Sequence, residues 1–265
     1  MPHVSHDPTS RLRNAIVPFI GVEPSAGFQK QFEAMLAPMQ EASGHCDRSR
    51  HCNDRIVNVW EGMLAVQYHR NEVERIIRET VDWVRVEFGE SWSGREISIS
   101  IKMSTLGFAY VAYLNAERST LDYLAKAIAV CFGQQHSTIT KLTKTIKQCE
   151  PSNLVGQVTS ACDGLHHRFS HVLSEGNRTS ERDQAQHYWP IKTPSLLVVL
   201  DAHGVGVRLQ DGSIDDLSAL NTRVSAGRQR LIDTVDQQIA DLEDFAIQRL
   251  EIAVKAERQR AQTTG

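Results

Sequence analysis

The chain lacks any apolar run near the roughly 18 residues that a membrane-spanning helix needs. Its opening residues, MPHVSHDPTSRLRN, lack the charged start and the apolar stretch of a signal peptide. Cysteine is scarce too: the five cysteines are odd in number and scattered, which argues against a disulfide framework and fits a reducing compartment. We therefore expect a cytoplasmic protein that has no membrane partner.

Excess charge and nucleotide-binding motifs are absent as well. The formal net charge is −3 at pH 7, so the chain as a whole does not attract polyanions, and nucleic acid would need a local basic patch. The sequence contains no phosphate-binding glycine loop, no Ser–His–Asp order and no dinucleotide fingerprint. The segment 201–206 contains two glycines, but no predicted helix follows it directly, so it does not have the arrangement of a cofactor-binding loop. We therefore expect no cofactor.

What is present predicts a folded, helix-rich protein. The hydrophobic fraction of 41% and the charged fraction of 23% are close to the globular average, and 265 residues are enough for a real hydrophobic core. Apolar residues recur at steps of three and four, which is the pattern of amphipathic helices. Long helices are predicted over residues 54–88, 104–132, 152–173 and 215–258. A shorter helix is predicted from Phe28, with an interruption near Pro38.

Two regions show strand patterns instead. Isoleucines at 97, 99 and 101 alternate with serines, which predicts a short strand or an extended linker and marks an internal boundary. Residues 195–200 and 205–209 are rich in β-forming side chains on either side of a turn, which predicts a hairpin. The expected fold class is therefore mainly α, a long-helix bundle with a small β-hairpin near 195–209.

The predicted elements suggest three regions. Residues 1–25 contain four prolines and read as an irregular leader. Residues 26–95 form an N-terminal helical region, and residues 96–265 form a helical bundle with the hairpin; the two also fit one continuous domain. The apolar spacing near 3.5 in 215–258 predicts a long bundle helix or a dimer seam.

One group of residues has the composition of a catalytic site. A short helix is predicted to begin near Thr179 or Ser180, where Ser180 and Asp183 have the spacing of a capping box, with Asp in place of the preferred Glu or Gln. On this helix, Asp183 and His187 are four residues apart and share a face, so the carboxylate can orient the imidazole. The long side chain of Arg182 can reach the same pocket. A guanidinium, a carboxylate and an imidazole are the parts that metal-free RNA cleavage needs. The alternative is structural: Asp183 caps the helix and His187 packs beside Trp189.

The segment Arg182-Asp-Gln-Ala-Gln-His187 resembles the R-(N/D/H)-x3–5-H signature of HEPN domains, small helical bundles found in many prokaryotic toxins and defence ribonucleases. The segment 114–125, LNAERSTLDYLA, looks like the "LRSALDHLA"-type helix of many bacterial HEPN-like proteins. Residues 182–189 look like their "RNxxxHGxW" segment, although Tyr188 stands where many relatives have glycine. The resemblance covers about residues 104–258.

This resemblance implies a four-helix bundle that dimerises and brings two Arg–His motifs to one RNA backbone. By analogy, Arg182 and His187 are catalytic and Asp183 orients them, with no metal required. The implied activity is that of an endoribonuclease acting as a toxin or defence effector, with an antitoxin or defence-system protein as partner.

A local basic patch is also predicted to hold RNA phosphates near Arg182. Its members are His166, His167, Arg168 and Arg178, and Tyr188 is assigned to RNA binding with them.

Two other groups contain the side chains that bind metals. Asp163, His167 and His171 are spaced by four on the predicted helix 152–173, where two histidines can hold a divalent ion; the alternative is a solvated polar face. The pairs His45-Cys46 and His51-Cys52 also offer ligands, but their spacing is not that of a zinc finger or ribbon. The alternative there is a polar loop between helices with exposed arginines at 48, 50 and 55.

A non-enzymatic function remains the alternative to the ribonuclease. It is a helical adaptor or structural protein that dimerises through the apolar residues of the segment 217–250.

Overall fold

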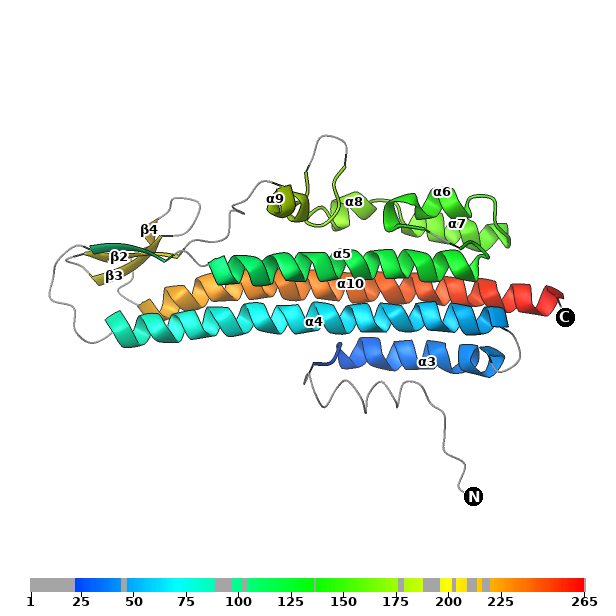
Figure 1. Ribbon diagram of the computed structural model, residues 1–265, viewed down its shortest axis with the longest axis horizontal. Helices are drawn as coiled ribbons and strands as arrows, with labels where there is room; N and C mark the ends of the chain where they lie inside the picture. Colours follow the sequence, from blue (N-terminus) through cyan, green and yellow to red (C-terminus); the bar gives the residue numbers. More distant parts are fainter. Residues whose placement is uncertain are drawn as a thin grey trace, which may run out of the picture. The chain divides into compact units, whose positions relative to one another are not determined.

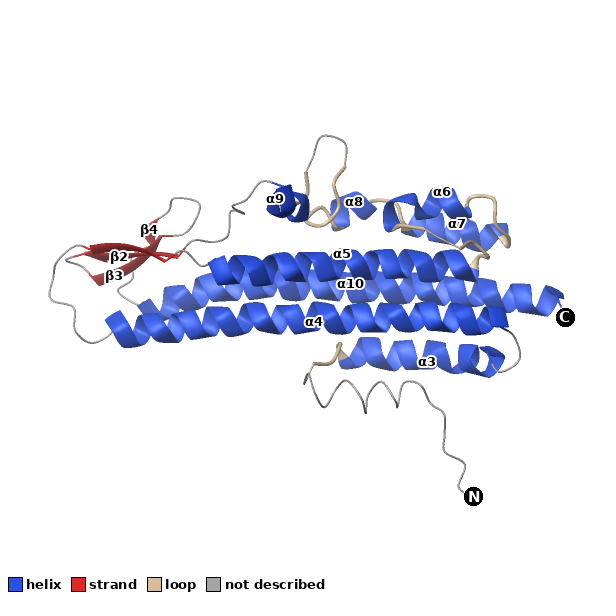
Figure 2. Cartoon of the chain, in the orientation of Figure 1, coloured by secondary structure: helices blue, strands red, loops and turns tan. Residues whose placement is uncertain are grey.

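The computed structural model describes residues 22–43, 47–88, 97–101, 104–135, 137–175, 179–187, 196–201, 204–208, 214–215 and 220–264. Helix is the dominant structure in these residues (Figure 2), so the prediction of a mainly helical protein is confirmed. Among the same residues, no helix combines the length and the apolar character that crossing a membrane requires.

The contacts divide the chain into two compact units. Unit 1 takes its residues from Met1–Tyr68, Ala116–Arg168 and Ile239–Gly265, and unit 2 from His69–Asn115 and Phe169–Gln238. Three long helices contribute to both units, so the division does not follow the boundary near residue 95 that the sequence suggested. They are α4 (Asp47–Phe88), α5 (Ser104–Cys131) and α10 (Leu220–Thr264).

The long helices agree well with the sequence periodicity. Helix α5 confirms the helix predicted over 104–132, and α4 ends at Phe88 as predicted. Helix α4 begins at Asp47, seven residues before the predicted start, and α10 begins at Leu220, five residues after it. The shorter helices are α3 (Ala26–Ser43), η1 (Ile139–Lys141), α6 (Leu142–Ile146), α7 (Ser152–Ala161), α8 (Leu165–Arg168) and α9 (Glu181–His187).

The interruption expected near Pro38 is wrong, because α3 continues through that residue to Ser43. A proline inside a helix removes one hydrogen bond and costs about 3 kcal/mol. Met35, Leu36 and Met39 are buried on both sides of Pro38. Their burial offsets the local cost, so tertiary packing overrides the intrinsic preference.

The continuous helix predicted over 152–173 is also wrong. Helix α7 ends at Ala161, where the N–H of Cys162 is shared between the carbonyls of Val158 and Thr159. Gly164 then adopts φ +75°, a left-handed conformation that a helix interior does not contain. The chain resumes as α8 over four residues and passes into a turn.

In unit 1, aromatic packing joins α3 to α4. The rings of Phe28 and Phe32 lie 6.0 Å and 5.3 Å from the ring of Trp60, measured between centroids. The segments of α3, α4, α5 and α10 that belong to this unit run side by side (Figure 1). Ser49 of α4 donates to Glu257 of α10 at 3.3 Å, inside the packed region.

A close approach of α4 and α5 depends on Gly62. A Cβ atom added to Gly62 would lie 2.6 Å from Thr120 Oγ1 and 3.1 Å from both Thr120 Cβ and Cγ2. Thr120 is fully buried, and its hydroxyl donates to the carbonyl of Ala116 at 2.8 Å. The absence of a side chain at residue 62 therefore sets the distance between the two helices.

In unit 2, four short strands form an antiparallel sheet in the order β1 (Ile97–Ile101), β2 (Leu196–Asp201), β3 (Gly204–Arg208) and β4 (Ile214–Asp215). Val198 is opposite Ile99 on one side and Val207 on the other. The strand β1 thus joins a partner about a hundred residues away, a pairing that local alternation does not reveal.

Side chains join the helical segments of unit 2. The guanidinium of Arg70 on α4 binds Asp236 of α10 through two bonds, Nε to Oδ1 at 2.8 Å and Nη2 to Oδ2 at 3.1 Å. The hydroxyl of Tyr113 on α5 donates to Gln238 of α10 at 3.1 Å. The first contact ties α4 to α10, and the second ties the segment of α5 that precedes residue 116 to α10.

We expect Gly62→Ala to lower the free energy of unfolding by up to about 2 kcal/mol. The clash with Thr120 costs about 1–3 kcal/mol, from which the helix-propensity gain of about 1 kcal/mol is subtracted. Denaturant unfolding followed by circular dichroism measures the change.

The matched control is Gly156→Ala in α7, because a Cβ there meets nothing within 4 Å. That variant should gain about 0.5–1 kcal/mol. Adding Thr120→Ala to Gly62→Ala should recover part of the loss. Equal effects of the two glycine substitutions would contradict the close approach.

Candidate functional site

The start of α9 is defined by a serine cap. The Oγ of Ser180 accepts a hydrogen bond from the N–H of Asp183 at 3.2 Å, so Ser180 is the N-cap that the sequence predicted. In a full capping box, a side chain of the first turn also accepts a hydrogen bond from the N–H of the capping residue. Here the N–H of Ser180 donates to Ser174 Oγ at 2.9 Å, so that second bond is absent from these contacts. Ser180 is buried, so the hydrogen bond by which it caps α9 lies within the packed structure.

Two further contacts hold the first turn of α9. The N–H of Arg182 donates to the carbonyl of His171 at 3.0 Å. The hydroxyl of Tyr110 on α5 donates to the carboxylate of Glu181 at 2.9 Å. Tyr110 is itself buried and stacked on Tyr113, with 6.0 Å between ring centroids. The backbone that carries Arg182 is therefore fastened to both the preceding turn and α5.

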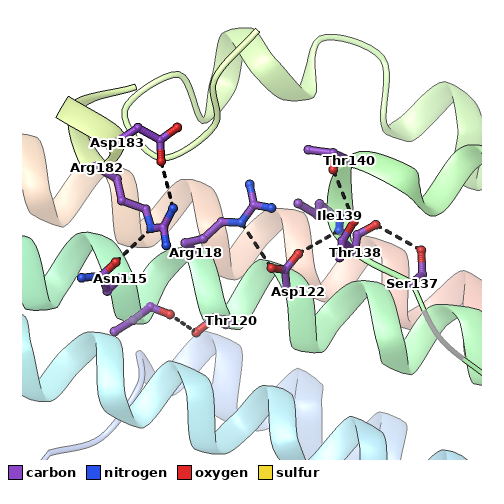
Figure 3. Close-up of polar contacts among 11 residues, drawn as sticks. Asn115, Arg118, Thr120, Asp122, Ser137, Thr138, Ile139, Thr140, Arg182 and Asp183 are labelled. Atoms are coloured by element: carbon purple, nitrogen blue, oxygen red, sulfur yellow. Dashed lines mark hydrogen bonds and ion pairs between the residues drawn. The ribbon is translucent and has the colours of Figure 1, made fainter. Parts of the chain in front are cut away.

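The guanidinium of Arg182 has two fixed partners (Figure 3). Its Nε donates to Asn115 Oδ1 on α5 at 2.9 Å, and its Nη1 donates to Asp183 Oδ1 at 3.0 Å. The side chain keeps 25% of its surface exposed. Across the described residues, Nη2 donates to no protein acceptor. Arg182 thus combines a fixed orientation with donors that can reach an external anion.

The carboxylate of Asp183 is engaged on both oxygens. Oδ1 accepts from Arg182, and Oδ2 accepts from the hydroxyl of Ser174. Among the described residues, Asp183 thus contacts Arg182 and Ser174, and its predicted role of orienting His187 stays a prediction. Helix α9 ends at His187. The side chain of His187 lies outside the described side chains, so its role stays a prediction.

The described residues of the predicted basic patch differ in their surroundings. Arg168 belongs to unit 1, where its Nη2 pairs with Asp241 at 3.3 Å and Asp244 at 3.1 Å, and its charge is largely neutralised. His166 is half-buried, and its Nδ1 is a buried atom with no hydrogen-bond partner in the part of the chain that the structure describes. Arg178 and Tyr188 lie outside the described residues. The RNA-binding role of these residues stays a prediction.

The metal site predicted at Asp163, His167 and His171 rested on one continuous helix, and that premise is wrong. Gly164 separates Asp163 from α8, and His171 follows α8 in a turn. Asp163 and His167 are exposed, whereas His171 is buried. In the described part of the chain, no three His, Cys, Asp or Glu side chains are grouped to hold a metal ion.

The alternative of a polar loop around His51 and Cys52 is also wrong, because both residues lie in α4. Cys52 is fully buried, while His51 is exposed, so the pair does not face one site. Cys52 continues the buried apolar face of α4, and such a face is the pattern of an amphipathic helix rather than of a polar loop. Arg50 is exposed as expected and Arg55 is half-buried. His45 and Cys46 fall outside the described residues.

Sequence reasoning did not identify Asn115, Tyr110 or Ser174 as part of this site. Asn115 lies 67 residues before Arg182, and an asparagine on a helix carries no signal of such a partner. The only available hint was its place in the segment 114–125, which resembles a HEPN helix. Their contribution became visible only from the folded chain.

Comparisons of the chain with models of known protein families, with curated proteins and with solved structures give no match. The resemblance to HEPN domains therefore stays a prediction.

We expect Ser180→Ala to weaken the start of α9 by about 1 kcal/mol, because the N–H of Asp183 loses its acceptor. Hydrogen exchange of the amides of residues 182–184 should become about fivefold faster. The neighbouring Thr179→Ala is the matched control, since Thr179 is exposed and its hydroxyl makes no cap. Equal acceleration in both variants would show that Ser180 is not the cap.

Proposed function

We propose that this chain is a HEPN-like, metal-independent endoribonuclease in which Arg182 binds the scissile phosphate and His187 transfers a proton. The observation that carries the proposal is the guanidinium of Arg182, which Asn115 and Asp183 hold while Nη2 stays available. An arginine that only kept the surface soluble would not need two hydrogen-bond partners to fix its guanidinium.

The chemistry of arginine suits this role. The guanidinium is planar, permanently charged and able to donate several hydrogen bonds to phosphate oxygens. A donor that is fixed before the substrate binds loses little conformational freedom when the charged phosphorane forms. The contacts of Arg182 therefore support transition-state stabilisation as its function.

The proposed reaction needs two proton transfers. A base removes the proton of a ribose 2′-hydroxyl, the 2′-oxygen attacks the adjacent phosphorus, and the bond from phosphorus to the 5′-oxygen breaks. An acid gives a proton to that leaving oxygen. The products are a 2′,3′-cyclic phosphate and a 5′-hydroxyl. Histidine suits both steps because its ordinary pKa lies near neutrality.

A homodimer is part of this proposal. Each chain carries one motif with one histidine, whereas the reaction uses a base and an acid. Two copies that face one RNA backbone would supply both, as the HEPN resemblance implies. In the same framework, the activity would be that of a toxin or defence effector that a partner protein restrains.

The order of elements is compatible with the HEPN-like part of the proposal. Helix α5 is followed by the motif helix α9, then by the strands β2 to β4, and finally by α10. This order of elements is one ground on which the HEPN-like part of the proposal rests.

The adaptor alternative has less support. It required the apolar residues of the last helix to form a dimer seam, but Val235, Leu242 and Leu250 are buried within the chain itself. From residue 231 onward, the apolar face of α10 is used for packing inside its own chain.

We expect the purified protein to cleave single-stranded RNA in the presence of EDTA and to leave 2′,3′-cyclic phosphate ends. His187→Ala should lower the cleavage rate by about 10²–10⁴-fold, the usual contribution of acid–base catalysis. Arg182→Lys should lower it by about 10²–10³-fold, because a point charge does not reproduce the fixed planar donor. Gel analysis of end-labelled RNA measures both rates.

The matched control is His51→Ala, since His51 is an exposed histidine on α4 in unit 1. It should retain full activity. Cleavage that survives His187→Ala would remove His187 from the catalytic role, and cleavage that EDTA abolishes would overturn the metal-independent mechanism.

A further inference from the structure

Among the described residues, Asn115 is the neutral side chain that accepts a hydrogen bond from the guanidinium of Arg182. It lies on α5 and is half-buried. Its Oδ1 accepts from Nε of Arg182 at 2.9 Å, a good distance for this bond. The contact joins two elements that are distant in sequence.

Two partners on different nitrogens determine the plane of the guanidinium. Asp183 alone, bound at Nη1, would leave the group free to pivot about that bond. The second bond at Nε removes this freedom, because the guanidinium is rigid and planar. The direction of the remaining Nη2 donors then follows from the position of Asn115.

The position of Asn115 is fixed by contacts that other residues of α5 make. Tyr110, on the same helix, donates to Glu181 at 2.9 Å, so α5 contacts two successive residues of α9. Tyr113 links this part of α5 to α10 at 3.1 Å. Asn115 therefore lies on a helix that is held by contacts with α9 and α10, and not on a loop.

The neutrality of Asn115 has a separate effect. Arg182 already has one carboxylate partner in Asp183. A second carboxylate at residue 115 would make the immediate surroundings of Arg182 net negative and would oppose the approach of a phosphate. An amide oxygen supplies the same hydrogen bond without that charge.

We infer that Asn115 is a positioning residue that orients Arg182 toward an RNA phosphate and, being uncharged, preserves the positive charge of the site. The part of this inference that concerns RNA rests on the proposed function. The part that concerns the orientation of Arg182 is independent of catalysis and is tested separately.

The first experiment observes the Arg182 side chain directly. In protein labelled with ¹⁵N-arginine, the Nε–H signal of Arg182 is identified by its loss in Arg182→Lys. We expect slow exchange of this proton with water in the parent protein and in Asn115→Asp, which keeps an acceptor. In Asn115→Ala, exchange should become at least tenfold faster. Unchanged exchange in Asn115→Ala would overturn the positioning role.

The second experiment separates orientation from charge with RNA cleavage kinetics. Asn115→Ala should lower kcat by about 10- to 100-fold, because a displaced guanidinium no longer meets the phosphorane. Asn115→Asp should mainly raise KM and reduce the salt dependence of RNA binding by about one charge. A purely structural role would instead lower the amount of folded protein in both variants without this kcat and KM split.

Asn153→Ala is the matched control, because Asn153 is an exposed asparagine on α7 in unit 1 and should change neither readout. If the parent protein does not cleave RNA but Asn115→Ala still accelerates the Nε–H exchange, the proposed function fails and the orientation of Arg182 by Asn115 stands. If the parent cleaves RNA and Asn115→Ala retains its kcat, the positioning role fails and the proposed function stands.

Discussion

The attachment of the first turn of α9 to α5 is the constraint on which the candidate site depends. Helix α9 has only seven residues, too few for stable helix formation in isolation. Its position comes from the bonds that Glu181 and Arg182 make to Tyr110 and Asn115, together with the bond to the carbonyl of His171. A site on such a short element can be precise only because a long helix supports it.

The polar contacts of α9 form one connected series. The N–H of Ser180 donates to Ser174, Ser174 donates to Asp183, Asp183 accepts from Arg182, and Arg182 donates to Asn115. Each group in the series has a partner of the complementary type, which rigidifies a partly buried polar cluster. The carboxylate of Asp183 therefore helps to fix the guanidinium of Arg182.

The partners of a charged side chain determine whether it can bind an external anion. A fixed, partly exposed guanidinium can bind a phosphate by its chemistry, and this is the ground on which we propose an RNA substrate despite the net charge of −3. Arg168, which the sequence analysis placed in the basic patch, pairs instead with Asp241 and Asp244. Two arginines of the same charge therefore differ in the partners that the fold gives them.

Local patterns in the sequence determined the helical character, the end of α4 at Phe88 and the cap at Ser180, because each depends on residues within a few positions of one another. Only the tertiary structure decided that α3 passes through Pro38 and that the chain turns at Gly164, since packing competes with local preference. Only the tertiary structure brought Asn115 to Arg182. A contact across 67 residues arises from the folding of α9 onto α5, and no local spacing encodes it.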